Sequence, residues 1–293
     1  MRTTTSISRL LLVTTLAMLT PALADAQLSN RGQTAPNAQN TPPPKTALDD
    51  QPARILSAFF GLDNAIRAPR ARGADGMPVT FTKCVGVPDS KLDPEAFTVI
   101  TRAGKRAQPT VVTTRPANEP SKRHTVLLLG EFGNEGEDPP VKVEITGELL
   151  LAGGENVQGL SVDVTPLKQG PSMVMAYMVQ PEDFHVDVPA NTKQVVVTVW
   201  NGGVTPMDGM STENHRLGYT VETADGKSVH PIALGDIGGD NYEYLFLDAE
   251  QAAIHVSIQS GLLMDPRADA NPASSVEVAG ESNRSRSHSS HTE

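Results

Sequence analysis

Short runs of β-branched and apolar residues, most of them closed by turn residues, constrain this sequence more than any other feature. Several of the runs alternate apolar with polar residues, a pattern typical of antiparallel strands with one solvated face. Helical periodicity is nearly absent. Many short strands separated by turns predict an all-β chain of the β-sandwich type. The clearest strand candidates are Thr125–Leu129, Val141–Ile145, Gln194–Trp200, Tyr219–Thr223 and Ile254–Ile258.

Glycine and proline positions predict where these strands turn. Asp225-Gly226 follows one strand candidate and predicts a hairpin, because the turn that matches strand twist needs positive φ. Asn201-Gly202-Gly203 predicts a second turn. Leu92–Phe97 and Gln180–Phe184 predict single helical turns, since each places a proline ahead of acidic residues that suit a helix N-terminus.

The first 26 residues have the features of a secretory signal peptide. Arg2 and Arg9 precede an apolar run, Leu10–Leu19, which is too short to span a bilayer. Ala24 and Ala26 supply the small residues expected before a cleavage point. We therefore expect a secreted or periplasmic protein. No later apolar run approaches the length of a membrane span, so no transmembrane segment is expected.

Composition divides the remaining chain into four parts. Residues 27–53 are rich in Pro, Gln and Asn and predict a disordered linker, and residues 280–293 predict a disordered Ser/His/Arg tail. Between them, two tandem antiparallel β-sandwich domains are expected at 54–150 and 155–279. The boundary is placed at the glycine pair within Leu151–Glu155. Because this connection is short, the two domains should abut.

Charge and cysteine content restrict partners and stability. The formal net charge is −10, which disfavours nucleic-acid partners and favours cations or basic partners. Cys84 is the single cysteine, so the chain has no internal disulfide and depends on packing for its stability. A buried Cys84 is the favoured interpretation, and a reactive thiol is the alternative.

The first half of the chain resembles the bacterial Ig-like domains of exported and surface-layer proteins. The resemblance rests on Met77–Thr82, Ser90–Val99, Gly104 and the strand at Thr125–Leu129, and it covers roughly residues 54–147. In the second half, Leu262–Pro272 is similar to the turn that precedes the last strand of such domains, with Ala268 or Ala270 where glycine is expected. The resemblance implies an Ig-like fold for the first domain. It implies no activity, because such domains mostly act as spacers and binding modules and fold alone does not fix function.

Two acidic loops are the candidate metal sites. The first places Asp236, Asp240, Asn241 and Glu243 around a glycine pair, which would let hard oxygen ligands converge on calcium. A polar loop built from turn glycines and Asx turns is the favoured alternative. Asp265 and Asp269 form a second acidic turn for which the same two interpretations hold. If both loops lie at one end of a sandwich, they could share an ion.

Catalytic motifs do not occur in the sequence. It contains no G-x-S-x-G, H-E-x-x-H, C-x-x-C, P-loop or G-x-G-x-x-G string. Scattered residues such as Ser172 and His185 keep open the alternative of a secreted hydrolase or another enzyme with a site on the second domain. Trp200 ends an apolar strand candidate, so burial is favoured over a sugar-stacking surface.

These observations favour an exported, non-catalytic binding or structural module of Ig-like type, with calcium as a candidate stabilising ion. A protein or another cell-surface component is the expected kind of partner. The two function classes predict different sites. An enzyme needs a concave pocket with titratable groups of perturbed pKa, whereas a binding module would use a sheet face or end loops.

Overall fold

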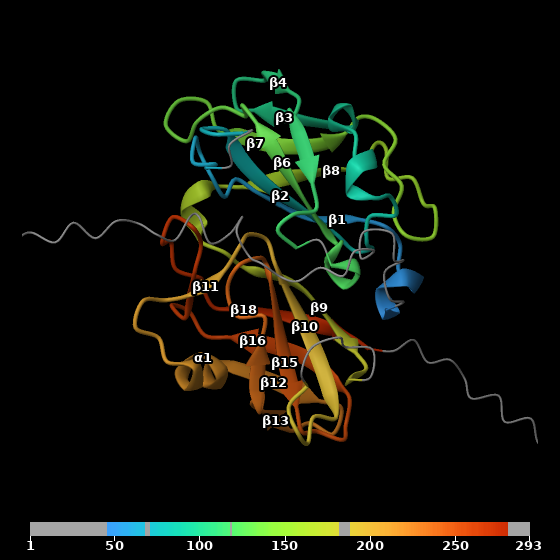
Figure 1. Cartoon of the computed structure of the whole chain (residues 1–293), viewed down its shortest axis with the longest axis vertical. Coiled ribbons are helices and arrows are strands. Elements are labelled where there is room, and N and C mark those ends of the chain that lie inside the picture. Colours follow the sequence, from blue (N-terminus) through green and yellow to red (C-terminus); the bar gives the residue numbers. More distant parts are fainter. Residues whose placement is uncertain (1–45, 68–70, 118, 182–187, 281–293) are drawn as a thin grey trace, which may run out of the picture.

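The computed structural model describes residues 46–67, 71–117, 119–181 and 188–280. This part of the chain is mostly β and contains two eight-stranded curled sheets and one α-helix. Figure 1 shows the first sheet in the upper half and the second in the lower half. Among the described residues, no helix has the length and apolar character needed to cross a bilayer.

The first sheet contains the strands of residues 55–165 in the order β4-β3-β7-β8-β1-β2-β6-β5. Its strands are β1 (Ile55–Phe59), β2 (Asp75–Phe81), β3 (Phe97–Thr101), β4 (Arg106–Ala107), β5 (Val111–Thr113), β6 (Thr125–Gly130), β7 (Pro140–Ile145) and β8 (Ser161–Thr165). Phe60, Met77, Phe97 and Leu128 belong to the main apolar core of this sheet. A smaller apolar cluster contains Ile66, Ala74 and Leu129.

The second sheet has the order β13-β12-β16-β18-β9-β10-β15-β14. Its strands are β9 (Met173–Val179), β10 (Gln194–Trp200), β12 (Tyr219–Thr223), β13 (Ser228–Val229), β14 (Ala233–Gly235), β15 (Tyr242–Leu247), β16 (Ala253–Ile258) and β18 (Ser274–Ala279). A separate two-stranded ribbon pairs β11 (Thr205–Pro206) with β17 (Leu263–Met264). Trp200, Tyr219 and Leu245 lie in the core of this second sheet.

The two sheets repeat one strand order. If the strands of the second sheet are numbered 1 to 8 in chain order, without the ribbon strands β11 and β17, both sheets have the strand order 4-3-7-8-1-2-6-5. In both, the first and last strands pair in parallel, β1 with β8 and β9 with β18. The prediction of purely antiparallel sheets is therefore wrong, because each sheet contains one parallel strand pair. The remaining strand pairs are antiparallel, and all five strand candidates from the sequence are strands.

The passage between the two sheets lies later than the predicted boundary at Leu151–Glu155. Strand β8 follows that segment, yet it pairs with β7 and β1 of the first sheet. The chain passes to the second sheet only after η6 (Leu167–Gln169). The glycine pair belongs instead to a loop in which Gly153 and Gly154 have positive φ.

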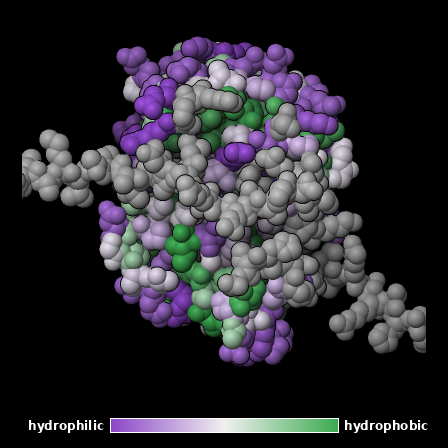
Figure 2. Space-filling model, in the orientation of Figure 1, coloured by the Kyte–Doolittle hydropathy of each residue, from purple (hydrophilic) through white to green (hydrophobic). Residues whose placement is uncertain are grey.

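Strands β10 and β15 are buried on both faces, which explains their unbroken apolar sequences. One face packs into the core of the second sheet, and the other carries Val197, Tyr242 and Tyr244 into a second apolar cluster. Tyr242 and Tyr244, which are two positions apart on β15, thus lie on one face of the sheet. Figure 2 shows hydrophilic side chains along the outer margins of both halves, with apolar side chains nearer the middle of each.

Turns and short helices follow the local sequence. Gly226 has a φ of 80° in the β12–β13 hairpin, as the Asp-Gly signal predicts. The turn expected at Leu92–Phe97 is the 3₁₀ helix η4 (Pro94–Ala96), while most of Gln180–Phe184 lies outside the described residues. The α-helix α1 spans Thr212–Gly218 and is capped by Ser211. The other 3₁₀ helices are η2 (Ala47–Asp50), η3 (Asp89–Lys91) and η5 (Pro120–Lys122).

The end of the predicted disordered linker is ordered, which corrects its boundary at residue 53. Residues Ala47–Asp50 form η2, where the Thr46 hydroxyl accepts a hydrogen bond from Leu48 N and Asp49 accepts one from Thr46 N. Such a reciprocal cap stabilises a helical turn. Leu48 is 3% exposed and joins the apolar cluster outside β9 and β10. The rest of the predicted linker, the predicted signal peptide and the predicted tail beyond Gly280 lie outside the described residues.

Candidate functional site: the junction between the two sheets

The segment between β5 and β6 of the first sheet packs against β9 and β15 of the second. Tyr177 on β9 donates a hydrogen bond from its hydroxyl to the carbonyl oxygen of Ser121, at 2.8 Å. Tyr242 on β15 donates one to the carbonyl oxygen of Lys122. Asn241 Nδ2 donates to Thr125 Oγ1 at 3.0 Å. These bonds hold η5 and the start of β6 against the second sheet, so the two units abut as the short connection predicts.

Lys122 places a buried positive charge in this junction. Its side chain is 4% exposed, and Nζ lies 2.5 Å from Asp236 Oδ2 and 2.8 Å from Asp240 Oδ2. Glu119 Oε2 is 3.6 Å away. Nζ also lies 5.9 Å and 5.6 Å from the ring centroids of Tyr242 and Tyr244, distances typical of cation–π contacts.

Burial and charge shift the pKa values of this cluster. Burial lowers the pKa of the Lys122 ammonium, but the charges of Asp240, Tyr244 and Asp236 outweigh burial and leave the pKa above its usual value. Burial raises the pKa of Asp240 to about 7, against the opposing charge of Lys122 and with the support of Asp236. One ammonium therefore neutralises part of an acidic cluster that is largely excluded from water.

The predicted calcium ligands of the first acidic loop do not converge on one point. Asp236 and Asp240 come together around Lys122, whereas Asn241 bonds to Thr125 and to the carbonyl oxygen of Trp200. Glu243 is fully buried and turns toward the core of the second sheet. There it accepts a 2.5 Å hydrogen bond from the Tyr219 hydroxyl and lies 3.2 Å from His215 Nε2.

The second acidic turn is stabilised by its own backbone. Asp265 Oδ1 accepts hydrogen bonds from the amides of Arg267, at 2.8 Å, and Asp269, at 3.0 Å. Burial raises the pKa of Asp265 to about 6. Ala268 has a φ of 67°, so its backbone has the left-handed conformation that favours glycine. Position 268 is one of the two at which the Ig-like resemblance leads us to expect glycine. Among the described residues, no group of three or more His, Cys, Asp or Glu side chains is arranged to hold a metal ion.

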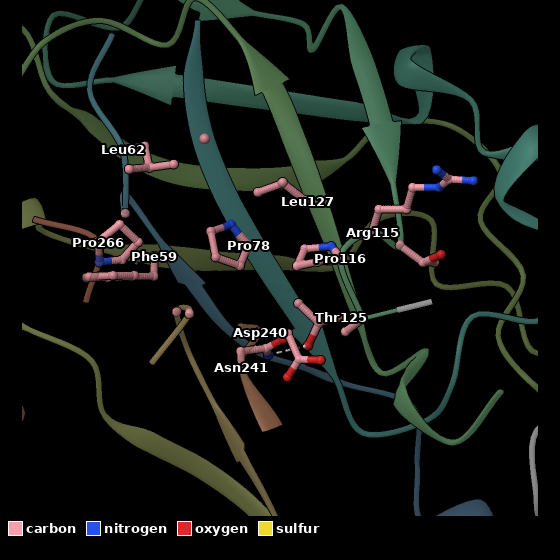
Figure 3. Close-up of a pocket in the computed structure, with 16 residues that line it drawn as sticks. Phe59, Leu62, Pro78, Arg115, Pro116, Thr125, Leu127, Asp240, Asn241 and Pro266 are labelled. Atoms are coloured by element: carbon pink, nitrogen blue, oxygen red, sulfur yellow. Dashed lines mark hydrogen bonds between the residues drawn. The ribbon is translucent and has the colours of Figure 1, made fainter. Parts of the chain in front are cut away.

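A pocket opens between the outer face of β2 and β6 and the end loops of the second sheet (Figure 3). The cavity has a volume of about 70 Å³ and is partly open to solvent. Gly202 allows the loop after β10 to approach Phe59 closely, since a Cβ there would lie 2.5 Å from Phe59 Cδ1. Its apolar lining includes Phe59, Leu62, Pro78, Pro116, Leu127 and Pro266.

Several polar groups around this pocket, among them Thr114, Thr125 and Asn241, have partners within the protein. The hydroxyl of Thr125 accepts from Asn241, and that of Thr114 donates to Asp89 Oδ1. In Figure 3 the carboxylate of Asp240 points away from the space between Phe59, Pro78 and Leu127. The pocket therefore offers mainly apolar surface to a ligand. The nearby carboxylates of Asp236 and Asp240 are paired with Lys122.

His124 lies beside Lys122 and is also buried at the junction. It is 2% exposed, and its ring centroid lies 5.2 Å from that of Tyr177. Burial lowers the pKa of His124 to about 4, so the ring is neutral at pH 7.

Burial also raises the pKa of the Cys84 thiol, which lies in a loop after β2 and is 4% exposed. The predictions that Cys84 and Trp200 are buried are confirmed.

Sequence reasoning singled out the acidic loop of this junction, with Asp236, Asp240 and Asn241, but missed the residues that contact it. Lys122 occurs in the polar string Glu119-Pro-Ser-Lys122, which is typical of an exposed turn. The pocket joins Phe59, Leu127 and Pro266, which are far apart in the chain. The signal that could have identified the junction is the double-faced apolar character of β10, since the outer face of such a strand needs a cover.

No protein-family model matches the chain, and no curated protein matches it significantly.

Proposed function

We propose that this protein is an exported, non-catalytic binding module built from two Ig-like domains. Strand order supports the Ig-like assignment. In the first sheet, β1-β2-β6-β5 corresponds to the A-B-E-D half of a variable-type immunoglobulin sandwich, and β8-β7-β3-β4 corresponds to G-F-C-C′. The second sheet repeats this order, so the proposal extends to both domains the resemblance seen in the first.

Export is the part of the proposal that rests on sequence alone. The charged start, short apolar run and small residues of positions 1–26 support it, and these positions lie outside the described residues. The acidic composition supports basic or neutral protein partners over nucleic acid. A protein or cell-surface component remains the proposed class of partner.

The single observation that carries the binding role is the apolar pocket at a junction held together by buried contacts. Ligand sites occur preferentially at domain interfaces, and a preformed site reduces the ordering cost of binding. Lys122 and Tyr177 fix η5, and η5 follows the segment that contains the pocket residue Pro116. The two domains therefore present the pocket in a defined shape.

Binding is favoured over catalysis by the environment of the titratable groups. Lys122, Asp240 and Glu243 are buried in contacts that hold the domains or the core of the second sheet. A catalytic group needs access to a substrate atom. Of the residues Ser172 and His185 considered for an enzyme site, His185 lies outside the described residues.

Differential capture tests the proposed function. The chain of residues 27–293 would be immobilised as wild type, as Leu127→Asp, which puts a charge on the pocket floor, and as Val141→Asp. Val141 is 38% exposed on β7, so this variant is a matched control for added surface charge. A periplasmic or secreted protein retained by wild type and Val141→Asp, but lost by Leu127→Asp, is the expected result. Equal retention by all three folded proteins would contradict a pocket-based role.

A further inference from the structure

Lys122 and Asp240 meet in surroundings that differ from those of an ordinary surface ion pair. Nζ of Lys122 lies 2.8 Å from Asp240 Oδ2, and both side chains are less than 10% exposed. The rings of Tyr242 and Tyr244 lie beside the same Nζ, so aromatic carbon covers part of the ammonium. An amine and a carboxyl group are therefore held in contact in a site with little water. Removal of both charges from water is costly even when they are paired.

Formation of an amide would remove this cost. An amide between a lysine and an aspartate side chain releases one water molecule and replaces two buried charges by a neutral bond. In solution the reaction is slow, because the two groups must meet in the right orientation and must exchange protons. Contact in a fixed geometry supplies the orientation. The proton exchange requires a further group that can both accept and donate a proton at the reacting atoms.

Asp236 is placed to supply this further group. Its Oδ2 lies 2.5 Å from Lys122 Nζ, so one ammonium contacts the carboxyl groups of both Asp236 and Asp240. Burial raises the pKa of Asp240 to about 7, so part of this carboxyl is protonated at neutral pH. The pKa of Lys122 lies above its usual value, so the resting group is an ammonium and needs a base in contact with it. Asp236 is that base, and Asp240 is the electrophile.

We propose that Lys122 and Asp240 join spontaneously in an isopeptide bond that locks the two sheets together, with Asp236 as the proton relay. Asp236 takes a proton from the Lys122 ammonium, and the lone pair freed on Nζ forms a bond to Cγ of protonated Asp240. Asp236 then gives its proton to the hydroxyl on Cγ, and the C–O bond breaks as water leaves. The surplus proton on nitrogen passes back to Asp236 and from there to solvent. The ion pair is the state that precedes this reaction.

A covalent bond at this place suits the composition of the chain. Cys84 is the single cysteine, so a disulfide within the chain cannot link the two sheets. Lys122 and Asp240 are 118 positions apart, so a bond between them closes a long loop and restricts the unfolded chain. This modification goes beyond the proposed binding function and does not depend on it.

The mass of the intact protein tests the proposal directly. The chain of residues 27–293 would be purified, denatured and measured by mass spectrometry. We expect wild type to be lighter than its sequence by one water molecule. A tryptic digest should lack cleavage after Lys122 and should contain a branched peptide that joins Lys122 to Asp240. This map uses the wild-type protein alone, so it does not depend on whether any variant folds.

Three substitutions separate the roles of the three residues. Lys122→Arg keeps the positive charge and the ion pair but cannot form the lysine amide, so this variant should have its full sequence mass. Asp240→Asn should show no loss of water, because an amide formed there would release ammonia instead. Asp236→Asn leaves both reacting groups in place. It should slow the reaction by about a hundredfold or more, since general acid–base catalysis contributes at least that factor, and it should be isolated mostly uncrosslinked.

Lys193 is the matched control within the same protein. Its Nζ lies 2.8 Å from Asp248 Oδ1 and 2.9 Å from Glu250 Oε1, but its side chain is 41% exposed. Water solvates this pair, so the peptides that contain Lys193 should remain uncrosslinked. Lys193→Arg should leave the loss of water at Lys122 intact.

Two results would overturn the proposal. The first is a wild-type protein with its full sequence mass after incubation in the folded state at neutral pH. The second is a loss of water that survives Lys122→Arg, which would assign the dehydration to another site, such as a succinimide at Asp225-Gly226. Neither result affects capture of a partner by the pocket, so the proposed function stands or falls separately.

Discussion

The ammonium of Lys122 lies 2.8 Å from a carboxylate oxygen of Asp240, although 118 positions separate the two residues in the chain. Lys122 belongs to the first sheet's segment and Asp240 to the second's. Both side chains are less than 10% exposed, at 4% and 8%. This ion pair therefore holds the two units together in an environment where an unpaired charge would be costly.

Removal of Lys122 should destabilise the protein strongly. Lys122→Met keeps most of the side-chain length but leaves Asp236 and Asp240 buried without their counterion. The expected loss in the free energy of unfolding is about 3–5 kcal/mol, measured by urea denaturation. Asp240→Asn in the same background should restore part of the loss, because it removes one of the uncompensated charges.

Lys193 provides a matched control for this experiment. It forms ion pairs with Asp248 and Glu250, but its side chain is 41% exposed. Solvent screens such a pair, so Lys193→Met should destabilise the protein much less than Lys122→Met does. Equal costs for the two lysine variants would show that burial at the junction does not strengthen the role of Lys122.

A side chain at position 202 should disturb the same junction by steric overlap. The Cβ of Gly202→Ala would lie 2.5 Å from Cδ1 of Phe59, which is itself fully buried. We expect a destabilisation of about 1–3 kcal/mol in thermal or urea unfolding. Gly136→Ala is the control, since its Cβ would meet only Asn134 Oδ1 at 3.9 Å. Phe59→Leu should relieve part of the cost of Gly202→Ala, and equal effects at positions 202 and 136 would contradict the close approach.

The strands could be predicted from sequence because their signal is local. Gln194–Trp200 and Tyr219–Thr223 match their strands, and Asp225-Gly226 forms the expected hairpin. The parallel pairing of β1 with β8 could not be predicted in this way, because it joins segments more than one hundred positions apart. The domain boundary was misplaced for the same reason. Strand β8 belongs to the first sheet because it pairs with β1 and β7, and its own residues do not reveal that pairing.

The junction could not be predicted because its chemistry depends on tertiary contacts. An acidic loop with glycines suits a metal ion or an internal ion pair equally well, and Lys122 distinguishes the two only once the fold places it beside Asp236 and Asp240. Glu243 looked like a member of that loop, but β15 directs it toward Tyr219. Leu48, the last large apolar residue of the linker, was a detectable sign that the linker ends in an ordered turn.

His124 should make the protein less stable in mild acid. Its folded-state pKa of about 4 lies below the usual value of about 6.5, so the unfolded chain binds more protons between these values. The stabilising contribution is therefore fully present above pH 6.5 and is lost as the pH falls toward 4. The shift corresponds to about 3 kcal/mol. Asp240 has the opposite effect, because its raised pKa favours the folded state below about pH 7.

Comparison of wild type with His124→Phe isolates the histidine from Asp240. The phenylalanine keeps an aromatic ring beside Tyr177 but cannot be protonated. The stability of the variant relative to wild type should increase by about 3 kcal/mol when the pH is lowered from 7.5 to 4, as measured by urea denaturation at intermediate pH values. A difference that stays constant over this range would show that the proton uptake of His124 is the same in the folded and unfolded states.

Glycine at position 268 should stabilise the turn before the last strand. Ala268 has a φ of 67°, a conformation in which the Cβ of an L-residue is crowded. Ala268→Gly should raise the free energy of unfolding by about 0.5–1 kcal/mol, net of the greater freedom of glycine in the unfolded chain. Ala270→Gly is the matched control, because Ala270 is not among the positive-φ residues of the described structure, and it should be neutral or destabilising. The reverse order would contradict strain at Ala268.

Calcium should leave the thermal stability of the protein unchanged. Asp236 and Asp240 face the ammonium of Lys122, and Asp265 already accepts two backbone hydrogen bonds within its turn. An ion bound at a hundredfold excess over its dissociation constant would stabilise the folded state by about 2.7 kcal/mol and raise the midpoint by several degrees. Thermal unfolding of residues 27–293 with excess calcium, and again with a chelator, should therefore give the same midpoint. A rise with calcium that Asp240→Ala leaves intact would direct the search to Asp265 and Asp269, whereas a rise abolished by Asp240→Ala would mean that the cation shares or replaces the place of Lys122.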